Sequence, residues 1–268
     1  MTTIRMRDLL AGALDDLRYE PTPKWIRATV GDRTVVDSRA AVLVWEPRRV
    51  VPSYAVPATD IAAALVPVET PAPAESASPT GRPRFLTPGD PFAVHTTPGT
   101  PFTVRLPDIE LPGAAFVPDD PVLSGVVLLD WRAFTGWSEE DQPVIAHPHD
   151  PFKRIDCLRS TRHVVVRHGD VVLADTRRAT LLFETGLRLR YYIPPEDVAT
   201  DLLEPTDSHT VCAYKGRASY WSARIGGEVL PDVAWAYEDP LPDAVPVRGL
   251  VAFYTEQLDV TVDDVVVG

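Results

Sequence analysis

The chain of 268 residues is 45% hydrophobic and 24% charged, which excludes a wholly disordered protein and predicts one large or two small globular domains. Its 26 basic and 38 acidic residues give a net charge of −12, which disfavours nucleic acid as a partner because phosphate backbones attract cations. No apolar run approaches the roughly 20 residues of a membrane span, so we expect no membrane contact. With two cysteines and no export signal, the expected location is the cytoplasm.

Residues 1–20 are expected to form an N-terminal helix. The stretch MTTIRMRDLLAGALDDLRYE mixes apolar and charged residues as an amphipathic helix does. Asp8, Asp15 and Asp16 interrupt any apolar core of a signal peptide. We therefore interpret this segment as a short amphipathic helix and not as a targeting signal.

Beyond residue 20, the sequence contains two related copies of one pattern. GDRTVVDSRAAVLVWE, residues 31–46, aligns without gaps with GDVVLADTRRATLLFE, residues 169–184. Further along, LPGAAFVPDDP at 111–121 resembles LPDVAWAYEDP at 230–240. Because the order of the matches is preserved, we predict a tandem duplication. Its parts are a degenerate first copy at 21–141, a linker at 142–159 and an intact second copy at 160–268.

The first copy contains a proline-rich insertion at residues 68–100, which includes VETPAPAESASP. Proline interrupts helices and sheet interiors, and the 28 prolines of the chain are roughly twice the average usage. Few apolar side chains are present in the insertion to offset the entropy lost on ordering. We therefore predict that it is the most mobile internal segment.

The second copy reads mostly as strands. HVVVRHGDVVLADTRRATLLFE contains β-branched runs separated by a His168-Gly169-Asp170 turn, which is typical of a hairpin. PPEDVATDLLEP predicts a helix of about two to three turns, because proline and acidic residues favour a helix start. The predicted fold class is therefore mainly β: two similar small antiparallel β domains in tandem, each with one short helix.

The strongest candidate site lies at Cys212-Ala213-Tyr214-Lys215-Gly216. An ammonium close to a thiol lowers the pKa of the thiol, so Cys212 is a candidate reactive thiolate. Lys215 is a candidate contact for a phosphate or carboxylate, or for a carbonyl through a Schiff base. The alternative is a tight turn with a buried cysteine and a lysine whose amine reaches solvent. The first copy has no such segment, although it keeps the surrounding pattern.

Aromatic residues are dense in the second copy. Strand alternation puts Tyr220 and Trp221 on opposite faces of a sheet, and Trp235 and Tyr237 on the same face. Such rings either fill a β core or stack on a planar ligand. The candidate ligand-binding residues are Tyr192, Tyr214, Tyr220, Trp221, Trp235, Tyr237 and the carboxylate Asp175, with Tyr254 in the same aromatic set.

Two carboxylates recur in both copies. Asp175 and Glu184 of the second copy correspond to Asp37 and Glu46 of the first. Retention in both copies favours a structural role, such as capping backbone donors or pairing with arginine. Glu184 is also a candidate general base, because its apolar neighbours predict a half-buried setting.

The sequence offers no metal site. His147 and His149 are held apart by Pro148, with no further ligand nearby in sequence, so a solvated linker is the favoured interpretation. Common nucleotide-binding, hydrolase and zinc-protease motifs are absent from the sequence.

The second copy contains six motifs in a fixed order: Gly169–Thr176, Leu181–Gly186, Arg190–Val198, Cys212–Trp221, Trp235–Pro240 and Gly249–Tyr254. In this order they resemble a bacterial family catalogued as domain of unknown function 427, sometimes labelled nucleotidyltransferase-like. The resemblance implies a compact β domain of about a hundred residues and no established reaction.

The leading functional hypothesis is a small-molecule pocket in the second copy, with Lys215, Cys212 and Glu184 as candidate catalytic residues. A non-enzymatic ligand-binding or protein-interaction module is the alternative from a different class, and a nucleotidyltransferase-like enzyme is the alternative that the family label suggests. The sequence does not identify the ligand, a cofactor or the oligomeric state.

Overall fold

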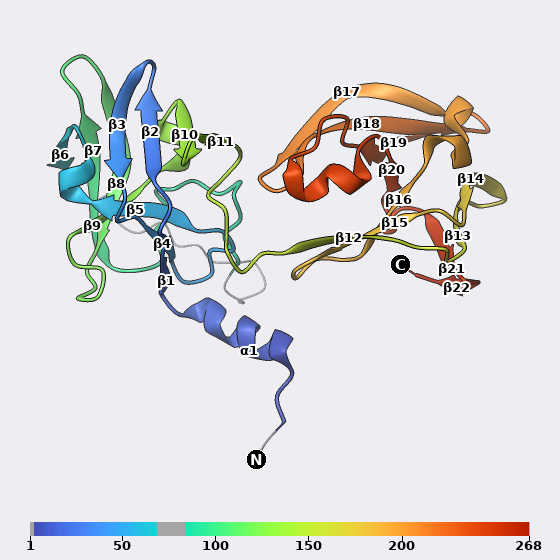
Figure 1. Ribbon diagram of the computed structural model, residues 1–268, viewed down its shortest axis with the longest axis horizontal. Helices are drawn as coiled ribbons and strands as arrows, with labels where there is room; N and C mark the ends of the chain where they lie inside the picture. Colours follow the sequence, from blue (N-terminus) through green and yellow to red (C-terminus); the bar gives the residue numbers. More distant parts are fainter. Residues whose placement is uncertain (1–2, 69–83, 268) are drawn as a thin grey trace. The chain divides into compact units, whose positions relative to one another are not determined.

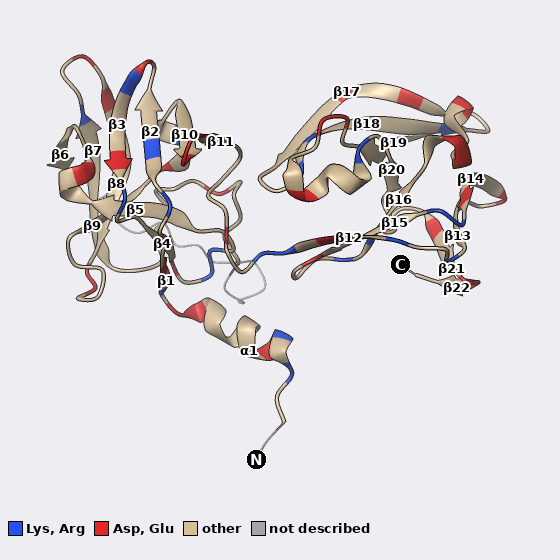
Figure 2. Cartoon of the chain, viewed as in Figure 1, with Lys and Arg blue, Asp and Glu red and all other residues tan. Residues whose placement is uncertain are grey.

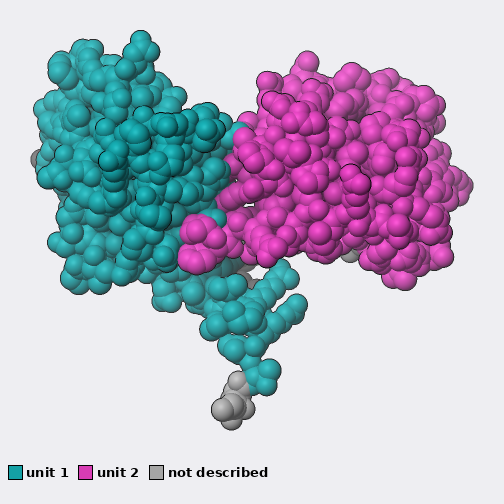
Figure 3. Space-filling view, in the orientation of Figure 1, with its two compact units in different colours: residues 1–150 teal, residues 151–268 magenta. Residues whose placement is uncertain are grey.

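A computed structural model describes residues 3–68 and 84–267 of the chain (Figure 1). The chain divides into two compact units, Met1–Asp150 and Pro151–Gly268 (Figure 3). All paired strands of the described residues are antiparallel. None of the helices in these residues has the length and apolar character needed to cross a membrane.

Unit 1 contains a large and a small sheet (Figure 1). The large sheet has the strand order β1 (Arg18–Pro21), β4 (Val42–Trp45), β5 (Ser53–Pro57), β9 (Val126–Leu129), β8 (Glu110–Pro118), β7 (Gly99–Arg105) and β6 (Ala64–Pro67). The small sheet has the order β11 (Gln142–Val144), β10 (Gly136–Glu139), β2 (Ile26–Val30) and β3 (Arg33–Ser38). Single 3-10 turns lie at η2 (Ala58–Asp60) and η3 (Trp131–Ala133).

Unit 2 has the same two sheets. Its large sheet has the order β12 (Ile155–Arg159), β15 (Thr180–Glu184), β16 (Arg190–Ile193), β20 (Val251–Phe253), β19 (Glu228–Ala236), β18 (Gly216–Ile225) and β17 (Leu203–Cys212). Its small sheet has the order β14 (Val171–Thr176), β13 (Val164–His168), β21 (Asp259–Val262) and β22 (Val265–Val266). The 3-10 segments are η4 (Pro195–Asp197), η5 (Thr200–Leu202) and η6 (Pro242–Val247).

The two units correspond strand by strand, and they share two irregularities of strand pairing. In the small sheets, the pairing shifts after Ala28 in β2 and after Val166 in β13, which are matched positions of the repeat. In the large sheets, it shifts after Phe102 in β7 and after Trp221 in β18. A bulge changes the direction of the side chains that follow it, so bulges at corresponding positions show that the two units have similar folds in detail. The predicted fold class of two similar, mainly β antiparallel halves is confirmed.

The predicted helix at PPEDVATDLLEP is instead two separate 3-10 turns, η4 and η5. Between them, Val198 forms a bridge with Ala174, and the Ala199 N–H donates to Leu173 O at 2.8 Å. These contacts tie the middle of the segment to β14. A helix this short gains too few internal hydrogen bonds to outweigh that pairing.

The helix expected over residues 1–20 is shorter in the structure. It comprises α1 (Met6–Gly12) and a 3-10 turn, η1 (Ala13–Asp15), and none of its residues is buried. From Arg18 onward the chain pairs with β4 and becomes the edge strand β1. The ladder with β4 competes with the helix for the backbone groups of this segment.

The proline-rich insertion is only partly described, because residues 69–83 lie outside the described residues; its mobility stays a prediction. The segment expected as a linker, 142–159, contains β11, which pairs with β10, and β12, which pairs with β15.

The central strands of the large sheet of unit 2, such as β16 and β20, are buried on both faces. Side chains at alternate positions, such as Tyr191 and Ile193, pack against the small sheet. Between them, Tyr192 points to the opposite face, called here the outer face, where η6 contributes Ala244 and Val247 to a second cluster. The candidate site lies on this outer face.

Candidate functional site

A buried carboxylate on the outer face of unit 2 is shared by two lysines. Glu184 lies at the end of β15, and its Oε2 accepts a hydrogen bond from Lys215 Nζ at 2.5 Å. Lys153 Nζ, just before β12, lies 3.4 Å from Glu184 Oε1. The side chains of Glu184, Lys215 and Lys153 are 7%, 11% and 24% exposed. We call these three residues the lysine–glutamate cluster.

The turn that carries Lys215 is locked against the protein's own backbone. Gly216 has a φ of +98°, and a Cβ at this position would lie 3.3 Å from Asp239 O. The Leu241 N–H donates to Lys215 O at 3.1 Å. Glycine at this position allows a close approach of another backbone segment. The approach that the structure shows is to the Asp239–Leu241 segment, and it fixes where the Lys215 side chain begins.

Tyr192 lies where the predicted site residues meet. Its Oη accepts a hydrogen bond from Trp235 Nε1 at 3.2 Å. Burial raises the pKa of Tyr192, and the Glu184 carboxylate is close enough to raise it further; the Trp235 hydrogen bond only partly offsets these effects. The phenol therefore stays protonated at neutral pH and is a hydrogen-bond donor.

Burial likewise raises the pKa of Tyr237, which packs in the same outer-face cluster. Tyr220 also belongs to this cluster, and its hydroxyl lies 2.8 Å from Thr210 Oγ1. Trp235, Tyr237 and Tyr220 therefore form a packed aromatic layer beside the lysine–glutamate cluster.

The thiol on which the Lys215 charge acts is Cys157, which sequence reasoning did not select. Cys157 is on β12 opposite Leu182, and its Sγ donates to Asp243 O at 3.7 Å. Burial raises the pKa of Cys157, and the Lys215 ammonium partly counteracts this. Cys212 ends β17 opposite Gly216. Both cysteines are free and half-buried.

Sequence reasoning also missed Lys153. Both Lys153 and Cys157 come before residue 160, where the second copy was predicted to begin. The alternation in IDCLR was the available signal: Ile155 and Cys157 pack on the outer face, whereas Leu158 is exposed.

An arginine covers the other side of the aromatic layer. The Arg190 guanidinium lies 5.5 Å from the Trp235 ring centroid and 5.6 Å from that of Tyr254. It donates to both carboxylate oxygens of Glu256, at 2.7 and 2.8 Å, and lowers the pKa of Glu256 to about 2. The pair holds Arg190 over the rings by cation–π contact.

Two of the predicted site residues, Trp221 and Asp175, lie away from the outer face, and a third, Tyr214, is buried beside Lys215. Trp221 packs against the core between the sheets. Asp175 is on β14 of the small sheet, where it accepts a hydrogen bond from His163 Nε2 at 2.7 Å. Tyr214 is buried in the turn before Lys215. The structure thus brings together Glu184, Lys215, Cys212, Tyr192, Trp235, Tyr237 and Tyr220, and it leaves Asp175 and Trp221 apart from them.

Unit 1 has a carboxylate at the same place with different partners. Glu46, the counterpart of Glu184, is fully buried and accepts hydrogen bonds from Arg49 Nε at 3.3 Å and the Thr96 backbone N–H at 3.0 Å. His95 Nδ1 lies 3.1 Å from it. Counting back from the shared bulge, Thr96 is the counterpart of Lys215. The lysine amine of unit 2 thus replaces a backbone donor.

No metal site is formed within residues 3–68 and 84–267, where no group of three or more His, Cys, Asp or Glu side chains has a suitable arrangement.

Residues 156–264 match the sequence model of a family described as a domain of unknown function, DUF427. Unit 2 is thus similar to DUF427. The matched residues include Cys157, Glu184 and Lys215, and they lie entirely in unit 2. No curated protein matches the chain.

Proposed function

We propose that unit 2 binds a small molecule through its carboxylate or phosphate group at the lysine–glutamate cluster. The observation that carries this proposal is the charge count of the cluster. Lys153 and Lys215 share Glu184, and neither lysine forms an ion pair with another carboxylate of the described residues. One positive charge is therefore left over at a largely buried place, where an uncompensated charge is costly. A bound anion supplies the missing negative charge.

The chain as a whole is acidic, so the local surplus of positive charge at the cluster is an exception to its overall charge. The chain has a net charge of −12, and Asp and Glu residues are distributed over both units (Figure 2). A small anion is repelled by such a protein at long range. Saturable binding of an anion therefore requires a local site, and two converging ammonium groups provide one because each acts as a compact point charge.

The geometry supports binding more directly than catalysis. Covalent catalysis requires an activated nucleophile, yet burial raises the pKa values of Cys157 and Tyr192 above their ordinary values. The aromatic layer around Trp235 is held by ring packing and by Arg190, which gives the site a stiff apolar floor. We therefore propose a binding module in unit 2, with unit 1 as a related scaffold whose carboxylate is satisfied internally.

A thermal-shift screen of the full chain tests the proposal. Inorganic phosphate and acetate are the probes, and Lys215→Met is the key variant because methionine fills the buried space without the charge. Lys24→Met is the matched control, since Lys24 pairs with the buried Glu139 of unit 1 at 2.6 Å. At a probe concentration about ten times Kd, binding stabilises the native state by roughly 1.4 kcal/mol. We expect this shift in the wild type and in Lys24→Met and its loss in Lys215→Met; equal shifts in all three proteins would contradict the proposal.

A further inference from the structure

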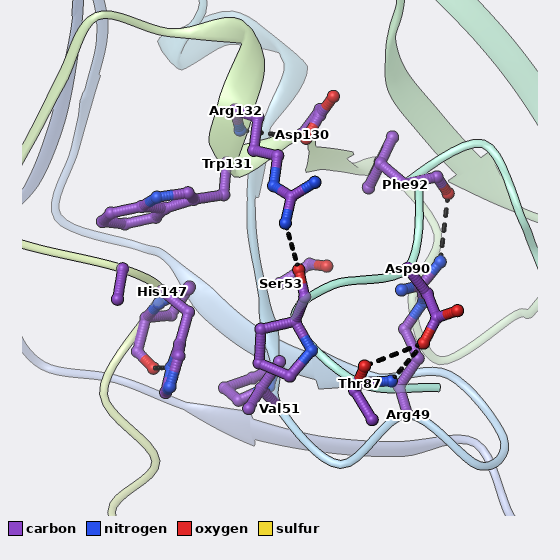
Figure 4. Close-up of a pocket in the computed structure, with 14 residues that line it drawn as sticks. Arg49, Val51, Ser53, Thr87, Asp90, Phe92, Asp130, Trp131, Arg132 and His147 are labelled. Atoms are coloured by element: carbon purple, nitrogen blue, oxygen red, sulfur yellow. Dashed lines mark hydrogen bonds between the residues drawn. The ribbon is translucent and has the colours of Figure 1, made fainter. Parts of the chain in front are cut away.

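Unit 1 contains a pocket on a part of its fold where unit 2 has an internal ion pair. Four segments line it: Arg49–Ser53 before β5, Thr87–Phe92, Asp130–Arg132 after β9, and Ala146–Pro148 (Figure 4). All of them belong to unit 1. Figure 4 shows the Trp131 indole and His147 along one side and the Arg132 guanidinium reaching over the pocket.

Strand register identifies the counterparts of two pocket residues. In unit 1, β5 pairs with β9 through Ala55 and Leu128, and in unit 2 β16 pairs with β20 through Tyr192 and Ala252. Counting from these matched pairs, Ser53 corresponds to Arg190 and Arg132 corresponds to Glu256. The position that holds a bidentate ion pair in unit 2 therefore holds a hydroxyl and a guanidinium in unit 1.

Within the described part of unit 1, the Arg132 guanidinium at this position has no carboxylate as an ion-pair partner. Arg132 Nη2 donates to Pro88 O at 2.6 Å, and Arg132 forms no ion pair with the residues that the structure describes. The two pocket carboxylates have other partners: Asp90 accepts hydrogen bonds from Arg84 and Thr87, and Asp130 accepts one from the Arg132 backbone N–H. The guanidinium therefore keeps donors for a further acceptor, because it has five N–H groups.

The apolar side of the pocket is a fixed aromatic ring. Trp131 stacks on Trp137 with centroids 5.4 Å apart and an interplanar angle of 12°, and Trp137 stacks on the buried Tyr54 at 5.0 Å. The Trp137 Nε1 also donates to Trp131 O at 3.0 Å. This stack holds the Trp131 indole in place, so that it presents a rigid planar surface at low entropic cost.

We propose that this pocket binds an aromatic carboxylate, whose ring packs on Trp131 and whose carboxylate is bound by Arg132 and the Ser53 hydroxyl. The ligand carboxylate takes the role that the Glu256 carboxylate has in unit 2. The site is independent of the lysine–glutamate cluster. Its ligand class follows from the Arg132 guanidinium, the Ser53 hydroxyl and the Trp131 ring, which line a single pocket, since guanidinium groups bind carboxylates in a bidentate, planar manner.

The test uses benzoate, benzyl alcohol and acetate as probes of the full chain, followed through the indole N–H signals in NMR spectra. We expect benzoate to shift the Trp131 and Trp137 signals saturably, and we expect benzyl alcohol and acetate to bind at least about tenfold more weakly because each lacks one of the two recognition elements. Saturation at the same concentration by benzyl alcohol would show a ring site without carboxylate recognition and would overturn the proposal.

Two variants separate this site from the cluster in unit 2. Arg132→Gln should weaken benzoate binding about tenfold, whereas the matched control Arg105→Gln, an exposed arginine paired with Glu110, should leave it unchanged. Lys215→Met should also leave benzoate binding unchanged, and Arg132→Gln should leave phosphate binding unchanged. Unaltered benzoate binding in Arg132→Gln would overturn the inference without affecting the proposal for unit 2.

Discussion

Lys215 Nζ lies 2.5 Å from Glu184 Oε2, at the position where unit 1 has only the backbone N–H of Thr96 facing Glu46. The carboxylates of Glu46 and Glu184 therefore differ in their hydrogen-bonding partners. Glu46 is enclosed by partners that belong to its own unit and has no exposure to solvent. Glu184 instead pairs with two lysines, whose side chains are 11% and 24% exposed.

This difference predicts unequal costs of removing the two charges. Glu46→Gln leaves the buried Arg49 without its counter-charge, so we expect a loss of about 3 kcal/mol or more in the free energy of unfolding. Glu184→Gln leaves Lys215 and Lys153 without their counter-charge, but the Lys153 side chain is 24% exposed against 8% for Arg49, so its ammonium reaches water more easily and we expect a smaller loss. Urea unfolding of both variants measures the two values. Equal losses would contradict the comparison.

The acid stability of unit 1 should depend on Glu139. Burial raises the pKa of Glu139, but hydrogen bonds from His149, Lys24 and Tyr54 outweigh this and hold the pKa at about 2. The folded-state pKa is lower than the unfolded value of about 4.5. This contribution to stability is thus complete above pH 4.5 and is lost as the pH falls toward 2. Melting temperatures of wild type and Glu139→Gln between pH 2 and 6 should converge in acid; a constant difference would show that Glu139 does not titrate in this way.

Gly216→Ala should cost more stability than the same change at a glycine in open space. Both Gly216 and Gly226 have positive φ, but only at Gly216 does an added Cβ meet backbone atoms, at 3.3 and 3.4 Å. We expect a loss of about 1 kcal/mol in Gly226→Ala from the left-handed conformation alone and a larger loss in Gly216→Ala. Denaturant midpoints of the two variants provide the comparison. A smaller effect at Gly216 would show that the backbone of the turn shifts to accommodate the added Cβ, and it would contradict the prediction.

The alkylation rate of Cys157 should depend on the charge of Lys215. Since burial raises the pKa of Cys157 and the Lys215 ammonium counteracts part of that rise, Lys215→Met should slow alkylation of Cys157 by iodoacetamide at pH 8. Mass spectrometry of the labelled peptide measures the rate in a Cys212→Ser background. Faster labelling in Lys215→Met would mean that the variant opens the site rather than removing a nearby charge.

The sequence predicted the fold and the meeting of Glu184 with Lys215, because both depend on regular features. The repeat showed matched strands, and strand alternation placed Trp235 and Tyr237 on one face. Trp221 was assigned to the ligand layer although alternation put it opposite Tyr220, and the structure places it in the inner core.

Lys153 and Cys157 could not be found in the same way. Cys157 is on β12 and Lys153 lies just before it; β12 pairs with β15, which is separated from it by a hairpin of the small sheet, and such pairing is not encoded in local periodicity. The pocket near Arg132 was equally hidden, because it depends on which arginine of the described residues forms no ion pair after folding. The predicted helix at PPEDVATDLLEP failed for a related reason, since Ala199 bonds to Leu173 across the fold.

Calorimetric titration of inorganic phosphate into the wild type, Glu184→Gln and Lys215→Met tests the anion site most directly. Removing the Glu184 carboxylate frees both ammonium groups, so the affinity should rise in Glu184→Gln, by about tenfold if roughly 1.4 kcal/mol of competition is removed. It should fall below the wild-type value in Lys215→Met. The account predicts this order of affinities, with one phosphate bound per chain. Absence of saturable phosphate binding in Glu184→Gln, in a protein that remains folded, would contradict it.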